Sequence, residues 1–314
     1  MKHTSKVIFI LLSIFLLSQV FGLFALNKDI KVIKNVETGK VETVNYSEPA
    51  IGARPEISSS GAFWYIIFAV FIGTMILLLL IRFRQVKVWK AWFFLAVWLT
   101  MTVTLGIFMP AIIAYIISLG VAILKIFKPN FFIQNISEIL MYTGIALLFV
   151  PLLNIFWVII LLLIISLYDA YAVWHSKHMV KMANFQTESK LFAGLTVPYK
   201  PSQSGGKTEI KISIPKGSNF KTEEKGEGKI ALLGGGDIAF PLIFSGVVMQ
   251  GLVLNYGLDK FTALLNAFII TFFSGIALML LFIYGKKDKF YPAMPFISAG
   301  CILGYGAILL IHLI

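Results

Sequence analysis

The stretch that decides the fold runs from Leu152 to Trp174 and reads LLNIFWVIILLLIISLYDAYAVW. As one α-helix it is long enough to cross a hydrocarbon core about 30 Å thick. Its only charged side chain is Asp169. An acid in the middle of a membrane helix costs roughly 2.5–3.5 kcal/mol to insert, so a retained Asp indicates a functional role. This stretch therefore predicts a membrane-spanning helix that carries one functional acid.

Apolar runs of similar length recur along the whole chain. Of its 314 residues, 58% are hydrophobic and 13% are charged, and that charged fraction is about half of the ~25% that soluble domains carry. We therefore predict an all-α integral membrane protein whose residues 1–314 form a single membrane domain with nine transmembrane helices. The predicted spans are 7–26, 62–81, 91–107, 109–124, 139–150, 152–174, 230–254, 261–284 and 291–313.

Two of the apolar runs set the number of spans. Residues 91–124 and 139–174 are each too long for one crossing. Pro110, after Gly106, and Pro151 are their natural breaks, because proline interrupts a helix. The boundaries of spans three to five stay open. The first run also fits a cleaved signal peptide, and we favour an uncleaved span.

The distribution of positive charge predicts the orientation. With the N-terminus in the cytoplasm, 21 of the 27 Lys and Arg residues fall on the cytoplasmic side. The positive-inside rule then places the hydrophilic loop 175–229 in the cytoplasm and the C-terminus outside the cell membrane. The net charge of +12 is explained by these loops, so we expect no nucleic-acid partner.

The hydrophilic loop has some local pattern of its own. Ile210, Ile212 and Ile214 alternate as in a β-strand over residues 208–214, and residues 175–183 have the spacing of a short interfacial helix. The single cysteine, Cys301, lies in an apolar run, and no Cys/His cluster is present in the sequence. We therefore expect no disulfide, no metal and no cofactor.

The predicted spans contain two carboxylates away from their ends, Asp169 and Asp237. Asp169 lies about 8 Å and Asp237 about 10 Å from the cytoplasmic ends of spans six and seven, so their depths match. Two carboxylates that share one proton can hydrolyse an amide, because one accepts a proton from water while the other protonates the carbonyl. A proton-coupled transporter or channel with the two acids as a relay is the alternative, and a catalytically inactive membrane scaffold is a third class.

Small and rigid residues flank the acids. Gly234, Gly235 and Gly236 precede Asp237 and would let span six or a substrate lie close to span seven. Pro292-Ala293-Met294 begins span nine at the depth of the two acids, where proline stiffens the backbone.

These three segments together resemble the motifs of a known family. Tyr168-Asp169, Gly234–Asp237 and Pro292-Ala293-Met294 are similar to the YD, GxGD and PAL motifs of the presenilin and signal peptide peptidase family, intramembrane aspartyl proteases with nine spans. Met294 replaces the usual Leu, with little consequence expected because both are apolar and similar in size. Tyr168-Asp-Ala and Lys177-His-Met look closest to the archaeal members.

The resemblance implies a function and a set of site residues. It implies an intramembrane aspartic endopeptidase of the GxGD type, which cleaves within or near transmembrane segments of single-span proteins in the lipid bilayer. Asp169 and Asp237 would be catalytic, and the support residues would be Tyr168, Gly234, Gly235, Gly236, Pro292, Ala293 and Met294. It also implies that an unwound substrate pairs as a strand near the loop and span seven, and that substrates have their N-termini outside. The sequence names no substrate, cleavage position or oligomeric state.

Overall fold

The computed structural model describes residues 5–34, 41–176, 191–199, 229–285 and 291–313. These residues form nine α-helices, and eight of them are long and apolar enough to cross a membrane. The result confirms the predicted all-α membrane fold, to which two small antiparallel sheets are added. The eight long helices are α1 (Ser5–Asp29), α2 (Ser59–Arg82), α3 (Val86–Gly106), α5 (Phe131–Phe149), α6 (Ile155–Tyr171), α8 (Gly236–Tyr256), α9 (Lys260–Tyr284) and α10 (Met294–Leu313). The ninth, α4 (Ala111–Phe127), is shorter.

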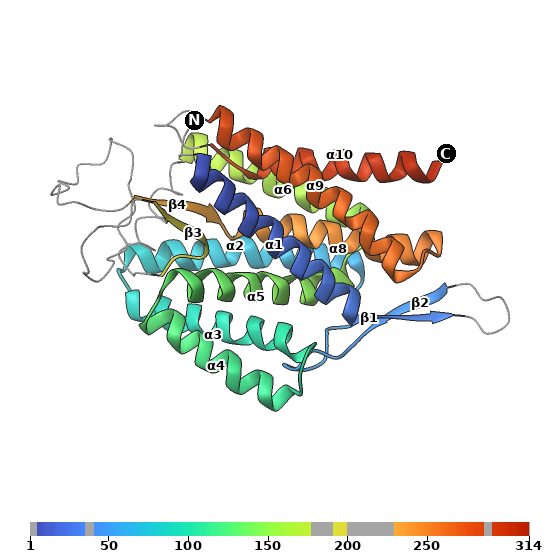
Figure 1. The fold of residues 1–314 in the computed structure, drawn as a ribbon. Helices are drawn as coiled ribbons and strands as arrows, with labels where there is room; N and C mark the ends of the chain where they lie inside the picture. Colours follow the sequence, from blue (N-terminus) through green and yellow to red (C-terminus); the bar gives the residue numbers. More distant parts are fainter. Residues whose placement is uncertain (1–4, 35–40, 177–190, 200–228, 286–290, 314) are drawn as a thin grey trace.

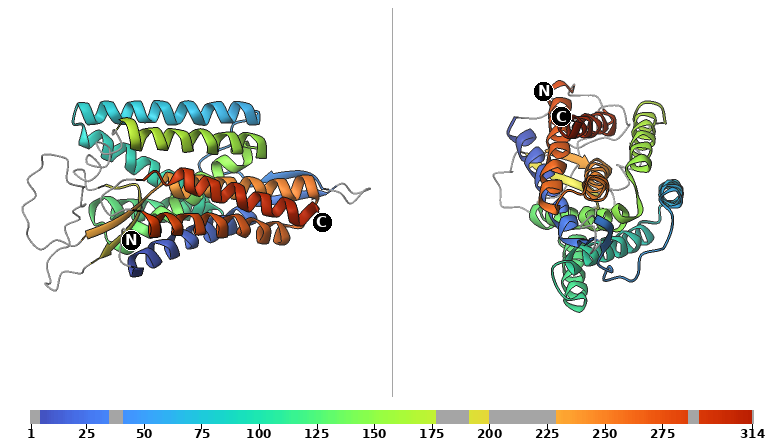
Figure 2. Two further views of the ribbon diagram at one scale, coloured as in Figure 1. Left: turned by 90° about the horizontal axis from the view of Figure 1, so that it is seen from above. Right: turned by 90° about the vertical axis from the view of Figure 1, so that its right-hand side faces the viewer.

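The helices run side by side, with the two termini of the chain at opposite ends of the bundle (Figure 1). Helix α8 lies inside, packed against α1, α5, α6, α9 and α10. Helix α2 lies at the edge beside α6 (Figure 2) and exposes most of its apolar surface. In a bilayer this apolar surface would face lipid, because apolar side chains are more stable against lipid tails than in water.

Helices α9 and α10 pack extensively against each other, and two glycines allow their backbones to approach closely. Gly300 and Gly304 lie one turn apart on α10, and a Cβ on either would strike the backbone of α9 near Phe273 or Ile270. Without side chains at these positions the two backbones approach closely, which is how small-residue stripes hold membrane helices together.

The first sheet follows α1 at the end of the bundle away from the N-terminus (Figure 1). Strand β1 (Ile30–Lys34) pairs with β2 (Val41–Tyr46). An ion pair between Asp29 and Arg54, with an N–O distance of 3.0 Å, holds the base of this hairpin. Arg54 also donates to the carbonyl of Leu147 at 3.2 Å, which fastens the hairpin to α5.

The second sheet replaces the expected beginning of span seven. Strand β4 (Lys229–Gly234) pairs with β3 (Gly194–Tyr199), with Gly194 opposite Gly234. We expected a span from residue 230, but α8 begins only at Gly236 because consecutive glycines are poor helix formers. The predicted strand at 208–214 lies outside the described residues, as does most of the interfacial helix at 175–183. The part that is described continues α6 as a π-helical turn, η2 (Ala172–Ser176).

Helix α5 begins earlier than the predicted span at 139. Asn130 caps it by accepting a hydrogen bond from the Ile133 N–H at 2.8 Å, and the helix starts at Phe131. Residues 131–138, which lie outside the predicted spans, are therefore helical, and Glu138 lies inside α5. A one-turn 3-10 helix with Pro151, η1 (Val150–Leu152), separates α5 from α6. Asn154 caps α6 in the same way as Asn130 caps α5.

Candidate active site

Two helix ends bring the aspartates together. Asp169 lies in the last turn of α6 and Asp237 in the first turn of α8, and these helices pack against each other. The two carboxyl groups are close enough to interact electrostatically. Asp169 is buried and Asp237 is half-buried. The end of α6 and the start of α8, which carry the two acids, lie at the same end of the bundle as strands β3 and β4 (Figure 1).

The start of α10 contacts Asp169 through its backbone. The N–H of Met294 donates to Asp169 Oδ2 at 3.2 Å, and the N–H of Ala293 also interacts with this carboxylate. The first N–H groups of a helix have no partner within it, and they favour a nearby anion. The Pro292–Met294 segment therefore contacts the acid through its peptide groups, and the Met294 side chain is buried in the core.

A pair of serines fixes α10 against α6 next to this contact. Ser166 lies one turn before Asp169, and its Oγ is 2.5 Å from Ser298 Oγ on α10. Ser166 also donates to the carbonyl of Leu162 at 2.8 Å within its own helix. The two hydroxyls hold the first turn of α10 at the height of Asp169.

The three glycines before Asp237 have different surroundings. A Cβ on Gly235 would collide with the Tyr142 side chain of α5, whereas a Cβ on Gly234 would lie 3.2 Å from Asp237 Oδ2. Gly236 is exposed, and a Cβ there would meet only ordinary contacts. We expected the glycines to admit span six or a substrate. At Gly235 the close neighbour is instead a side chain from α5.

Some of the expected site residues lie around the two acids and others do not. Around the acids the structure gathers Gly234, Gly235, Ala293 and Met294. Pro292 is buried just before α10. Tyr168, next to Asp169 in sequence, has 39% of its surface exposed because it lies on another face of α6.

A polar cluster on α4 and α5, which the predicted site residues do not include, lies next to Tyr142. Lys125 on α4 forms an ion pair with Glu138 on α5, and both side chains are almost completely buried. Gln134 Nε2 donates to the same Glu138 oxygen, Oε1, at 3.0 Å. The sequence pattern that indicates this cluster is the spacing of Gln134, Glu138 and Tyr142. These polar residues are four positions apart and so share one helix face. The cluster was missed because the predicted span began one residue after Glu138.

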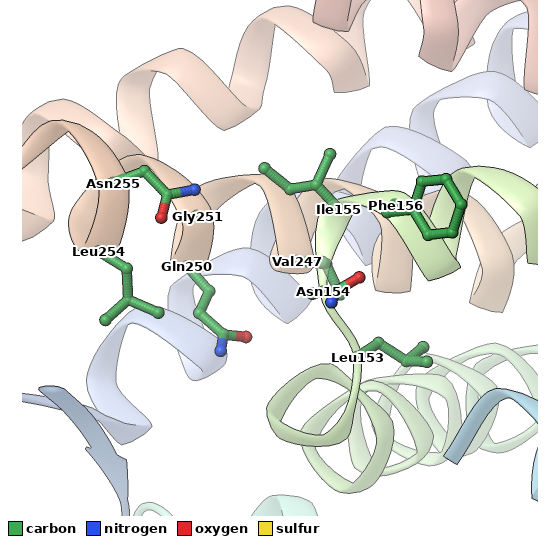
Figure 3. A pocket seen from close by; sticks show the side chains of 9 residues that line it. All are labelled: Leu153, Asn154, Ile155, Phe156, Val247, Gln250, Gly251, Leu254 and Asn255. Carbon is green, nitrogen blue, oxygen red and sulfur yellow. The ribbon is translucent and has the colours of Figure 1, made fainter. Parts of the chain in front are cut away.

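A cavity of about 350 Å³ lies at the other ends of α6 and α8, away from the aspartates (Figure 3). The amide side chains of Asn154, Gln250 and Asn255 line part of it. Within the described ranges, no three His, Cys, Asp or Glu side chains are grouped so that they could hold a metal ion.

Comparison with known proteins covers nearly the whole chain. Residues 30–313 match the family described as "Signal-peptide peptidase, presenilin aspartyl protease". Two crystal structures, each of a presenilin family intramembrane aspartate protease, are similar in fold. One has a TM-score of 0.55 and 15% identity over 95% of this chain and 94% of the other. The second has a TM-score of 0.56 and 17% identity over 96% of both chains. No curated protein matches the sequence.

Proposed function

Since this chain belongs to the signal-peptide peptidase and presenilin family of aspartyl proteases, we propose that Asp169 and Asp237 form its catalytic pair. The observation that carries the proposal is that the last turn of α6 and the first turn of α8, two helices long and apolar enough to cross a membrane, bring the two carboxyl groups close enough to interact electrostatically. The proposed reaction is hydrolysis of a peptide bond within or near the transmembrane segment of a single-span protein.

The pair can perform this reaction with a water molecule and no cofactor. The ionised carboxylate accepts a proton from water, whose oxygen attacks the peptide carbon, while the protonated carboxyl group donates to the carbonyl oxygen. The tetrahedral intermediate then breaks its C–N bond, and the nitrogen leaves with a proton from the pair. The peptide groups of Ala293 and Met294 hold one of the acids during these steps. We expect activity to fall at low pH, when both acids are protonated, and at high pH, when both are ionised.

Substrate binding uses the edge of the second sheet in this proposal. Asn135 of α5 occupies the outer edge of β3, because its side chain accepts from the Thr196 N–H at 3.0 Å and donates to the Thr196 carbonyl at 2.9 Å. Gln134 covers the same edge at the carbonyl of Gly194. Within the part of the chain that the structure describes, the other edge of this sheet belongs to β4, which leads directly to Asp237. An unwound substrate that pairs with β4 brings its backbone to the acids.

The orientation of the protein in the membrane is part of the proposal. The N-terminus and the 175–229 loop lie in the cytoplasm, the C-terminus lies outside, and α6 runs from outside to inside. Substrates whose N-termini are outside match this orientation.

The decisive experiment measures cleavage by the purified protein in liposomes. The substrate is a single-span peptide with a fluorophore and a quencher on either side of the cleaved region. Asp169→Asn and Asp237→Asn keep the shape but remove the acid, so each should abolish cleavage, as should a transition-state analogue of aspartyl proteases. Asp259→Asn is the matched control, because Asp259 only caps α9 and Asn caps helices equally well. Substantial cleavage by either active-site variant would rule out the proposed pair.

A further inference from the structure

Tyr142 of α5 lies between two carboxylates. Its side chain is only 3% exposed, and its hydroxyl contacts the backbone at Gly235, two residues before Asp237. The hydroxyl is also close to Glu138, one turn earlier on α5, and within electrostatic range of Asp237. Yet it makes no hydrogen bond of good geometry to any described residue. A buried hydroxyl whose nearest acceptor, Glu138, is poorly aligned gains from a better-placed one, which points to a second partner in another state.

The Glu138 carboxylate has one occupied and one unoccupied oxygen. Oε1 accepts from Lys125 and Gln134, whereas Oε2 is buried and makes no hydrogen bond within the described part of the chain. The ion pair with Lys125 fixes Glu138 in place, because separating two buried charges is strongly unfavourable. Glu138 is therefore a rigid acceptor beside the Tyr142 hydroxyl.

We propose that Tyr142 is a positioning residue for Asp237, whose hydroxyl donates to the Asp237 carboxylate when substrate is bound and rests beside Glu138 when the site is empty. The inference deepens the proposed function and rests on it. A hydroxyl hydrogen rotates freely about its C–O bond, so it can serve either acceptor with small side-chain movements. Catalytic hydrogen bonds often tighten only in the substrate complex. The bond to Tyr142 orients Asp237 and stabilises its negative charge.

The charged groups around Tyr142 determine which carboxylate its hydroxyl can stabilise. Glu138 and Asp237 both act on it electrostatically, Lys125 neutralises Glu138 from α4, and Asp169 on α6 acts on Asp237. With Glu138 already paired, the carboxylate that gains most from a hydroxyl donor is Asp237, because like charge from Asp169 opposes its ionisation.

The test is Tyr142→Phe, which removes only the hydroxyl, in the liposome cleavage assay with the fluorescent single-span peptide. A transition-state analogue counts the active sites, so that kcat refers to folded enzyme. We expect kcat to fall about tenfold, the effect of one hydrogen bond to a charged group, with KM within about twofold. The alkaline limb of the kcat profile should move to higher pH, because Asp237, the second of the two acids to ionise, has lost a donor. The matched control is Tyr115→Phe, which loses a hydrogen bond to the Ala50 carbonyl near the start of α4.

Each result separates this inference from the proposed function. If Tyr142→Phe has the kcat and pH profile of the wild type, the positioning role is wrong, even if its thermal stability is lower. The same holds if Tyr115→Phe shifts the profile equally. If Asp237→Asn is inactive in either case, the catalytic pair stands. If Asp237→Asn cleaves normally, the proposed function itself fails.

Discussion

The backbone N–H of Met294 donates to the Asp169 carboxylate at 3.2 Å, although 125 residues separate the two positions. This bond joins the first residue of α10 to the last turn of α6. It depends on how the two helices are held together, and the Ser166–Ser298 pair lies directly beside it. The packing of α10 against α6 therefore helps to set the environment of Asp169.

Ser298→Ala tests that dependence. The substitution removes a hydroxyl contact of 2.5 Å between α6 and α10, so we expect a threefold to tenfold loss of cleavage, roughly the effect of one neutral hydrogen bond. The measurement is kcat/KM in liposomes. Ser274→Ala is the control, because the Ser274 hydroxyl donates only to Thr271 within α9. Equal activities of the two variants would contradict the role of the serine pair.

Gly235→Ala should inactivate the enzyme, whereas Gly236→Ala should not. A Cβ on Gly235 collides with the Tyr142 ring and hydroxyl, but a Cβ on Gly236 lies 3.6 Å from Phe240, an ordinary contact. The collision displaces the segment that leads into Asp237, and small misplacements of catalytic groups cost about 100-fold in rate. We would compare cleavage rates and binding of the transition-state analogue. Similar rates for the two variants would contradict the prediction, because they would mean that the Tyr142 side chain moves aside without displacing Asp237.

Removing one partner of the Lys125–Glu138 ion pair should destabilise the protein more than replacing both partners with apolar residues. Lys125→Met leaves Glu138 as an unpaired buried charge, which costs about 3–5 kcal/mol. The double variant Lys125→Met/Glu138→Leu removes both charges and should recover most of that stability. Thermal unfolding in detergent measures both, with the exposed Lys128→Met as the control. A single variant as stable as the control would mean that the pair is not essential to the bundle.

Asn135→Leu should weaken substrate binding more than turnover. The substitution removes both hydrogen bonds to Thr196 and so loosens the β3–β4 sheet that we propose receives the substrate. We expect KM to rise severalfold with little change in kcat, because the acids are not touched. In the control, Asn266→Leu, the lost bond is to Thr262 of the same helix, α9. A change in kcat alone would argue against the sheet as the substrate site.

Reporter fusions test the topology. A reporter at the C-terminus should be active only outside the cytoplasm, and a reporter within residues 200–207 only inside. The motivation is the concentration of Lys and Arg in the loops on the N-terminal side. The opposite result would reverse the orientation of α6 and the substrate orientation that follows from it.

The sequence by itself determined the membrane fold and the family. Apolar runs long enough to cross a bilayer can be read without knowledge of their neighbours, since the bilayer is the same solvent for each. Asp169 and Asp237 stood out for the same reason, because an acid is conspicuous in an apolar run. Their catalytic role remains a proposal.

Only the tertiary structure decided what surrounds the two acids. Whether Glu138 is a loop residue or a buried one depends on Lys125 of the neighbouring helix α4, and Gly235 has its significance only because Tyr142 lies against it. Strand β4 similarly requires β3 as its partner. Polar groups are stable in a membrane where partners from other helices satisfy them, and local hydropathy carries no information about those partners.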